Sequence, residues 1–347
     1  MVKNIFEEYM SFVNQNKDLT PEFKLIPLTE KQNSFQYVGG QILNGKLYSI
    51  INSSEKLLIY DLTNDKMDFT GNFDKTDFKW TGGCVCSNNL YAFPRFENCL
   101  LKYCPELNSF EKIPCAFKYE NEHHYGGVCT NDGIIYQPPR NSDHILKWNI
   151  KNKTCEKIQI NNGAKSRYCG SVIHPNGYAY FIPEKDFPVI KMNLKTEETE
   201  YTDVPFPCMT FNPVVASDGN IYGFRSGKGD IGSGIVKIDT KTDKVSVLHE
   251  DVMFGSYGTK NAINGKIYSL PGYTNDVWEF DPLTQKLKKC YTLSKNESVH
   301  YAGGAVNING DIYAIPVHAN TILKISFEKY GINIPSSIYN AFFKDFY

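Results

Sequence analysis

Along almost the whole chain, short apolar runs alternate with polar turns, and the same arrangement returns every 42 to 46 residues. In each copy an aromatic or polar residue and several small residues lead into an apolar run. A tight turn such as Asn-Gly follows, and then a second apolar run that contains a tyrosine. The tyrosine is present in all seven copies, as Tyr48, Tyr91, Tyr136, Tyr180, Tyr222, Tyr268 and Tyr313. A repeat of this length is typical of one propeller blade, so the pattern predicts seven blades.

Each copy divides into four strands, which we call A to D in chain order. Strand A leads into the tight turn, strand B holds the tyrosine, strand C is a further apolar run, and strand D is more polar. The turns between strands A and B include Asn44-Gly45, Asn176-Gly177, Asn264-Gly265 and Asn309-Gly310. Asparagine and glycine accept positive φ, so we expect type I′ turns there. The predicted fold is all-β: a seven-bladed β-propeller of four-stranded antiparallel blades, with short N- and C-terminal helices.

The last copy lacks a clear strand D, whereas a strand of that kind, Phe23–Leu28, stands alone before the first copy. We therefore predict that Phe23–Leu28 pairs with Ile322–Ser326 and closes the ring, which removes an exposed sheet edge. The predicted domains are an N-terminal helical flank at 1–20, the propeller at 21–328 and a C-terminal helical flank at 329–347.

Both flanks carry apolar residues at helical spacing. Residues 4–16 form one such segment, and Ser336 or Ser337 is a candidate N-cap for the other. We expect both helices to pack against the propeller. The alternative is a docking face for a protein partner, because an exposed aromatic stripe would need burial elsewhere. The apolar side chains of the second segment are Ile338, Tyr339, Phe342, Phe343, Phe346 and Tyr347.

Charge and composition restrict the classes of partner that the chain can bind. With 37 basic and 38 acidic residues the formal net charge is −1, which excludes the basic excess of bulk nucleic-acid or membrane-surface binding. No apolar run is long enough to span a membrane, and acidic residues in the first twenty positions argue against a signal peptide. A cytoplasmic location is the prediction. The ten cysteines are scattered without a CxxC pair, which favours reduced, buried thiols.

The repeats resemble those of the kelch group of β-propeller proteins over residues 21–328. Tyr60, Tyr103 and Trp148 in strand C stand where a kelch blade has its tyrosine, and Phe110 stands where it has a tryptophan. The kelch double glycine closes strand B, however, whereas here pairs such as Gly39-Gly40 open strand A. The resemblance implies a propeller with a binding role, and it transfers no functional residue.

Strand alternation places the A–B and C–D turns on one face of the ring and the D–A and B–C loops on the other, which we call the mouth. Loops that differ between blades on a fixed scaffold are where sites usually lie. The chain has only four arginines, and all four fall at the predicted mouth, where their planar donors suit carboxylates or phosphates. The candidate ligand-binding residues are Tyr37, Lys79, Trp80, Arg95, His123, His124, Arg140, Arg167, Tyr168, Arg225, His300, Tyr301 and His318.

Less specific explanations exist for these residues. Each arginine could pair with an acid such as Glu97, Asp143 or Glu184, or stack on an aromatic ring. His123 and His124 with His300 or His318 could bind a metal, but no carboxylate stands at a ligand spacing, so we expect neither metal nor cofactor. The glycine-rich segment at 227–234 lacks the ending of a phosphate loop and is expected to be a flexible insertion.

The leading functional hypothesis is a non-enzymatic recognition module that binds an anionic small molecule or an acidic protein segment at the mouth. The alternative is a carbohydrate-active lyase or hydrolase that uses the same residues, with a tyrosine as proton donor and an arginine neutralising a uronate. A third hypothesis is a scaffold within an assembly, whose working surface would lie on the helical flanks.

Overall fold

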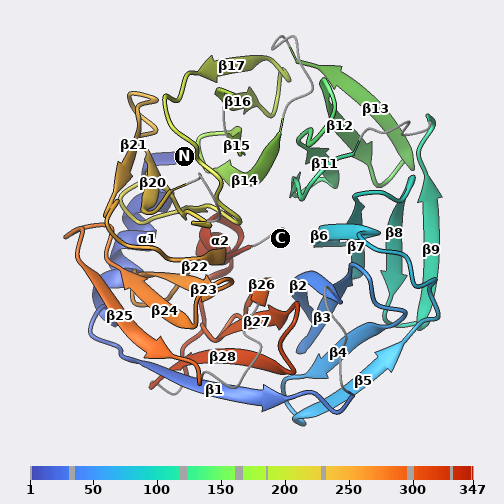
Figure 1. The fold of residues 1–347 in the computed structure, drawn as a ribbon, viewed down its shortest axis with the longest axis horizontal. Coiled ribbons are helices and arrows are strands. Elements are labelled where there is room, and N and C mark those ends of the chain that lie inside the picture. Colours follow the sequence, from blue (N-terminus) through green and yellow to red (C-terminus); the bar gives the residue numbers. More distant parts are fainter. Residues whose placement is uncertain are drawn as a thin grey trace.

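The chain forms seven four-stranded sheets arranged around a central axis (Figure 1), which confirms the predicted all-β propeller. The computed structural model describes residues 2–30, 36–117, 123–160, 167–184, 187–227, 232–294, 301–328, 331–344 and 346. Successive strands within each sheet are antiparallel neighbours, as short hairpin connections require.

The strands of the first three blades are β2 (Tyr37–Leu43), β3 (Lys46–Ile51), β4 (Leu57–Asp61) and β5 (Lys66–Thr70); β6 (Trp80–Cys86), β7 (Asn89–Pro94), β8 (Cys99–Cys104) and β9 (Ser109–Pro114); and β10 (Val128–Cys129), β11 (Ile134–Gln137), β12 (His144–Asn149) and β13 (Thr154–Gln159). Blades 4 and 5 are β14 (Tyr168–His174), β15 (Tyr178–Pro183), β16 (Val189–Asn193) and β17 (Thr199–Thr202); and β18 (Val214–Val215), β19 (Ile221–Phe224), β20 (Ile235–Ile238) and β21 (Val245–Leu248). Blades 6 and 7 are β22 (Ser256–Asn261), β23 (Ile267–Pro271), β24 (Asp276–Phe280) and β25 (Leu287–Thr292); and β26 (Tyr301–Val306), β27 (Ile312–Pro316), β28 (Thr321–Phe327) and β1 (Pro21–Pro27).

The ring is closed by the N-terminal strand. β1 is antiparallel to β28, with Phe23 opposite Ile325 and Ile26 opposite Ile322. This is the predicted pairing; the strand begins two residues earlier and ends at Pro27, so Leu28 follows it. Strands from opposite ends of the chain thus share one sheet, and the last blade has no exposed strand C.

The tight turns between strands A and B correct one expectation. Asn44 and Gly45 have φ values of 50° and 73°, as a type I′ turn requires. In the turns of Gly177, Gly265 and Gly310 only the glycine has positive φ. There the glycine amide donates to the carbonyl three residues earlier, as from Gly177 to His174. These are three-residue connections, a type I turn followed by a left-handed glycine, so the type I′ prediction was wrong for them.

The repeated tyrosine of strand B belongs to the core of every blade. All seven of these side chains are at most 4% exposed. Several phenol groups keep a polar partner at the strand end, as Tyr222 does with Asp218 and Tyr136 with Glu197. The tyrosine therefore contributes a large apolar ring to the blade, and in these two cases a carboxylate accepts from its hydroxyl.

Both terminal helices cover the face that carries the A–B turns, which we call the floor. α1 (Val2–Asn16) buries Tyr9 and Val13, and the Tyr9 ring stacks on Phe342 with 4.2 Å between centroids. The Asn264 amide, in the A–B turn of blade 6, donates to the Leu19 carbonyl just after α1. The N-terminal flank is therefore attached to the ring at its floor.

The C-terminal segment lies at the centre of the ring (Figure 1). α2 (Ser336–Ile338) continues into a π-helical turn, η2 (Tyr339–Phe343). Pro335 occupies the N-cap position and makes no side-chain cap, so the predicted serine cap is wrong; the Ser337 hydroxyl instead donates to Glu8 on α1. The described aromatic stripe is mostly buried, so it serves packing rather than docking. Its most buried members are Ile338, Phe342, Phe343 and Phe346.

The ten cysteines are all free thiols, seven of them buried. The sulfurs of Cys115 and Cys155, from blades 2 and 3, lie 2.9 Å apart. No helix in the described part of the chain is long and apolar enough to cross a membrane.

Candidate functional site

The start of strand A decides which side chains reach the mouth. In blades 1, 2, 4, 6 and 7 the pairing of strand A with strand B shifts register there, as between Tyr37 and Gly40. Gly39 and Gly82 sit in these bulges with φ values of 98° and 71°, which glycine adopts without strain. The double glycine that opens strand A is therefore a bulge, and it reorients the residues before it.

The first residue of strand A points into its own blade, contrary to our expectation. Trp80 Nε1 donates to the Cys99 carbonyl, Tyr168 Oη donates to the Pro188 carbonyl, and Tyr301 Oη bonds Thr321. Lys79, just before the strand, donates from Nζ to the carbonyls of Asp74 and Thr76 and so holds the preceding loop. Six predicted ligand-binding side chains are at most 2% exposed and brace the blades instead: Tyr37, Lys79, Trp80, His124, Tyr168 and Tyr301.

The next residue along the chain faces the axis, and the sequence prediction missed it. In blades 3 and 5 this residue, Tyr125 or Phe211, precedes strand A. These residues come from different blades yet form one apolar cluster, which is only possible where the blades converge. Phe211 lies 5.9 Å from the Tyr125 ring and 5.1 Å from the Tyr257 ring, so aromatics span the channel. A signal was available in the sequence: in most blades this residue directly precedes a glycine, as Val38 precedes Gly39 and Tyr125 precedes Gly126. The cluster includes Val38, Tyr125, Cys169, Phe211, Tyr257 and Ala302.

Three of the four arginines gather beside this cluster. The guanidinium carbons of Arg95 and Arg140 lie 4.9 and 4.7 Å from the centroid of the same ring, Tyr125. Arg95 also stacks on Phe78 at 4.2 Å. The exposed Arg167 begins the neighbouring blade. We call Arg95, His123, Tyr125, Arg140 and Arg167 the arginine cluster.

The electrostatics of the arginine cluster are strongly positive. Burial, together with the charges of Arg95, Arg140 and Arg167, lowers the pKa of His123 to about 4, so its ring is neutral at pH 7. Glu184 pairs with Arg140, with 3.3 Å between Oε2 and Nη2. Three guanidinium charges thus lie close enough to His123 to lower its pKa, and Glu184 pairs with one of them.

The remaining candidates lie elsewhere or are not placed. Arg225 is 6% exposed, and its Nη1 donates to the Ser233 carbonyl at 2.5 Å, so it braces the B–C loop of blade 5. His318 is half-buried in the loop after β27. His300 lies outside the described residues, as does the middle of the glycine-rich segment at 227–234.

The histidines give no support to the metal hypothesis in the part of the chain that is described. No group of three or more His, Cys, Asp or Glu side chains is placed to hold a metal ion there. His124 Nε2 lies 3.2 Å from the His144 carbonyl, and burial lowers its pKa to about 3. The His124 ring is therefore neutral, and its contact with the His144 carbonyl lies within blade 3.

Known proteins share this architecture but not this sequence. No protein-family model and no curated protein matches the chain. Among solved structures it is similar to a streptogramin B lyase, at 14% identity and a TM-score of 0.73, covering 90% of this chain and 99% of that one. It is also similar to virginiamycin B lyase from Staphylococcus aureus (11% identity, TM-score 0.74, 88% and 99% covered). A chain of the mitotic checkpoint complex gives 10% identity and a TM-score of 0.66, with 89% and 94% covered. These likenesses show the propeller fold.

Proposed function

We propose that the chain is a recognition module whose arginine cluster binds an acidic segment of a partner protein. The observation that carries the proposal is the stacking of Arg95 and Arg140 on one tyrosine ring. Two like charges held this close repel each other, and Glu184 offsets part of the charge of Arg140. A carboxylate-bearing ligand would relieve the repulsion and accept the parallel donors of a guanidinium.

The aromatic neighbours suit a peptide as well as a simple anion. Phe96 and Tyr273 are 53% and 39% exposed, and Tyr257, next to Tyr273, joins the cluster at the axis. Exposed rings beside arginines are the residue types enriched at protein interfaces. The resemblance to kelch propellers, and the presence of a similar propeller in the mitotic checkpoint complex, agree with a binding role.

The titration behaviour of the cluster favours binding over proton transfer. An efficient general base has a pKa near the working pH, whereas that of His123 is about 4. Burial and hydrogen bonding to Tyr273 raise the pKa of Tyr257 far above its usual value, which makes its phenol a weak acid. Neither group is tuned for catalysis near neutrality.

A lyase is the second candidate, because two of the similar solved structures are lyases of nearly the same length. In that case Arg140 would neutralise a substrate carboxylate and Tyr257 would protonate the leaving oxygen. Incubation with uronate-containing oligosaccharides would then yield an unsaturated product that absorbs in the near ultraviolet. Absence of that absorbance, together with peptide binding, would reject the lyase.

The binding proposal is tested by fluorescence anisotropy with a labelled ten-residue glutamate-rich peptide and its glutamine counterpart. Arg95→Lys and Arg167→Lys keep the charge but lose the fork of donors, so we expect about tenfold weaker binding from each. Lys241→Gln, in an exposed C–D turn on the floor, is the matched control and should not change binding. Equal affinity for both peptides, or unchanged affinity in both arginine variants, would overturn the proposal.

A further inference from the structure

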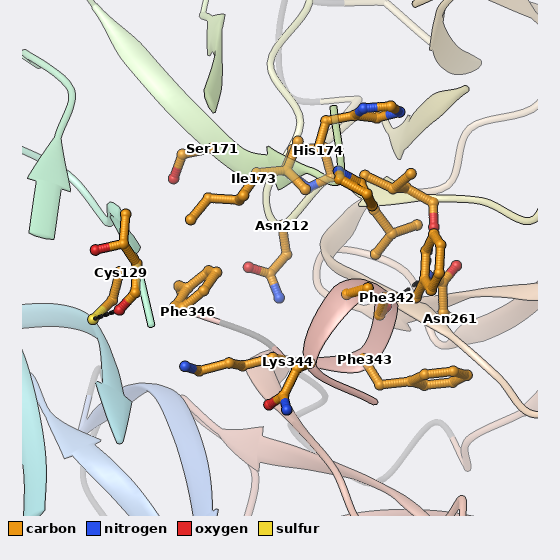
Figure 2. A pocket seen from close by; sticks show the side chains of 18 of the residues that line it. Cys129, Ser171, Ile173, His174, Asn212, Asn261, Phe342, Phe343, Lys344 and Phe346 are labelled. Atoms are coloured by element: carbon orange, nitrogen blue, oxygen red, sulfur yellow. Dashed lines mark hydrogen bonds between the residues drawn. The ribbon is translucent and has the colours of Figure 1, made fainter. Parts of the chain in front are cut away.

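A cavity of about 530 Å³ lies on the other side of the ring, between the inner strands of blades 3 to 6 and the C-terminal segment. Figure 2 shows Asn212 from blade 5 directed toward the C-terminal residues, with Phe346 on one side and Phe342 on the other. The volume is in the range of sites that hold small organic ligands. It is separate from the arginine cluster, none of whose residues lines it.

The described lining of this cavity combines apolar walls with amines and amides. Valine and phenylalanine side chains, including Val172, Val306 and Phe342, supply the walls. No aspartate or glutamate occurs among the described lining residues, whereas two lysines do, Lys260 and Lys344. A cavity with cationic groups, amides and apolar walls matches an anionic molecule with an apolar body.

Lys260 is the residue that makes this match specific. It lies on β22, the inner strand of blade 6, and is only 1% exposed. Burial lowers the pKa of its ammonium well below the usual value. Placing a cation in such surroundings is costly unless an anion accompanies it. A bound carboxylate would stabilise the charged form of Lys260 and so raise its pKa, which favours proton uptake as the ligand enters.

The second lysine and the amides can orient the ligand. Lys344 follows η2, and its Nζ is 3.4 Å from Asn131 Oδ1 in the A–B turn of blade 3, so its side chain crosses from the C-terminal segment to the ring. Asn261 Nδ2 donates to the carbonyls of Val215 and Phe342, both at 2.8 Å, and fixes the segment that covers the cavity. Asn212 and Asn340 supply further amides to the lining.

We propose that this cavity is a binding site for a small carboxylate with an apolar, aromatic-sized body. Lys260 provides the charge, Lys344 and the asparagines orient the carboxylate, and the valine and phenylalanine walls hold the body. The site does not depend on the proposed function of the mouth.

The test uses two matched probes, 4-iodobenzoate and 4-iodobenzyl alcohol, in isothermal titration calorimetry at pH 7.5. We expect saturable binding of the acid that is at least tenfold tighter than that of the alcohol. Repeating the titration in buffers of different ionisation enthalpy should reveal proton uptake when the acid binds. In crystals soaked with the acid, the anomalous signal of iodine should lie beside Lys260.

Two variants make the test decisive. Lys260→Met should abolish both the preference for the acid and the proton uptake, whereas Lys244→Met, an exposed lysine in a C–D turn, should leave both unchanged. Should Lys260→Met fail to fold, Asn340→Trp, at an exposed helical position that lines the cavity, should block binding by filling the space. Equal affinity for acid and alcohol, no saturable binding of the acid, or binding unaffected by the cavity variants would overturn the proposal. Arg167→Lys should not alter the binding of 4-iodobenzoate, which separates this site from the mouth.

Discussion

The floor and the mouth of the ring are built from the same seven repeats, yet they differ in what the chain adds to them. On the floor the A–B turns are short in every blade, and both terminal helices pack over them. At the mouth the residue that follows strand B changes with each blade: Arg140, Glu184 and Gly272 occupy equivalent places. A repeat can thus conserve one face for packing while the other varies without cost to the fold.

The two faces also differ in the interactions that hold their side chains in place. The floor buries Phe342 and Phe343 against α1 and the ring. Its contribution to the free energy of unfolding therefore comes mainly from apolar burial. The mouth holds guanidinium groups on the rings of Phe78 and Tyr125, contacts worth about 0.5–1 kcal/mol each. Substitutions on the floor should therefore act on stability, and substitutions at the mouth on binding.

Truncating one phenylalanine on each face is the most direct test of this difference between floor and mouth. Phe342→Ala removes a side chain that is 5% exposed and packs on Phe6 and Tyr9, and should cost about 3–5 kcal/mol of unfolding free energy. Phe96→Ala removes a ring that is 53% exposed and should cost no more than about 1 kcal/mol. Urea denaturation measures both. Similar losses from the two variants would show that the mouth is as tightly packed as the floor.

The sequence predicted the ring, its closure by β1 and the burial of the strand B tyrosines, because all of these follow from period, alternation and the missing fourth strand. The turn types were missed for a local reason. Asn-Gly fits a type I′ turn, but it also fits a type I turn followed by a left-handed glycine, and one extra loop residue decides between them. In the turn of Gly177 the extra residue is Pro175, which lies in the loop because β14 ends at His174 and β15 begins at Tyr178.

Acid should affect both faces through histidines held neutral. His174 on the floor accepts from the Asn176 amide at Nδ1 and lies 3.0 Å from the Gly219 carbonyl at Nε2, and burial lowers its pKa. Because the folded-state pKa lies below the unfolded value of about 6.5, its neutral form stabilises the fold above that pH. The contribution is lost as the pH falls through the folded-state pKa, at no more than about 1.4 kcal/mol per pH unit for one proton.

His174→Gln should therefore lower the unfolding free energy at pH 7.5 and flatten its decline below pH 6.5. His123→Gln, at the mouth, should flatten the decline down to pH 4 with a smaller loss at pH 7.5, because this ring is only half-buried. Denaturation at several pH values separates the two. A variant whose pH profile matched that of the natural chain would exclude its histidine as a source of acid sensitivity.

The candidate site was less predictable than the fold, and strand A explains why. Arg95, Arg140 and Arg167, which the sequence analysis assigned to the mouth, lie close enough to His123 to lower its pKa. The side chains next to them were assigned to the wrong side, because alternation was counted without the bulge at Gly39 and Gly82. A single residue at positive φ reverses which neighbours face the axis. Tyr125, the ring on which two arginines stack, was also missed; it lies before β10, next to Gly126 and Gly127, which both have positive φ.

The smallest expected effect is the most specific to the mouth. Glu184 is the carboxylate that pairs with Arg140, so it competes with any acidic ligand for that guanidinium. Glu184→Gln keeps the size of the side chain and removes its charge. A partly exposed ion pair is worth up to about 1 kcal/mol, so affinity for the glutamate-rich peptide should rise about two- to fivefold, and the melting temperature should fall slightly. The gain should shrink at high salt, as expected for a charge effect.

Glu97→Gln, whose carboxylate pairs with Lys112 in blade 2, is the matched control and should give a smaller gain. Weaker peptide binding in Glu184→Gln would instead mean that Glu184 positions Arg140 for the ligand, and the cluster would then have to be treated as an ion-paired unit rather than as an excess of positive charge.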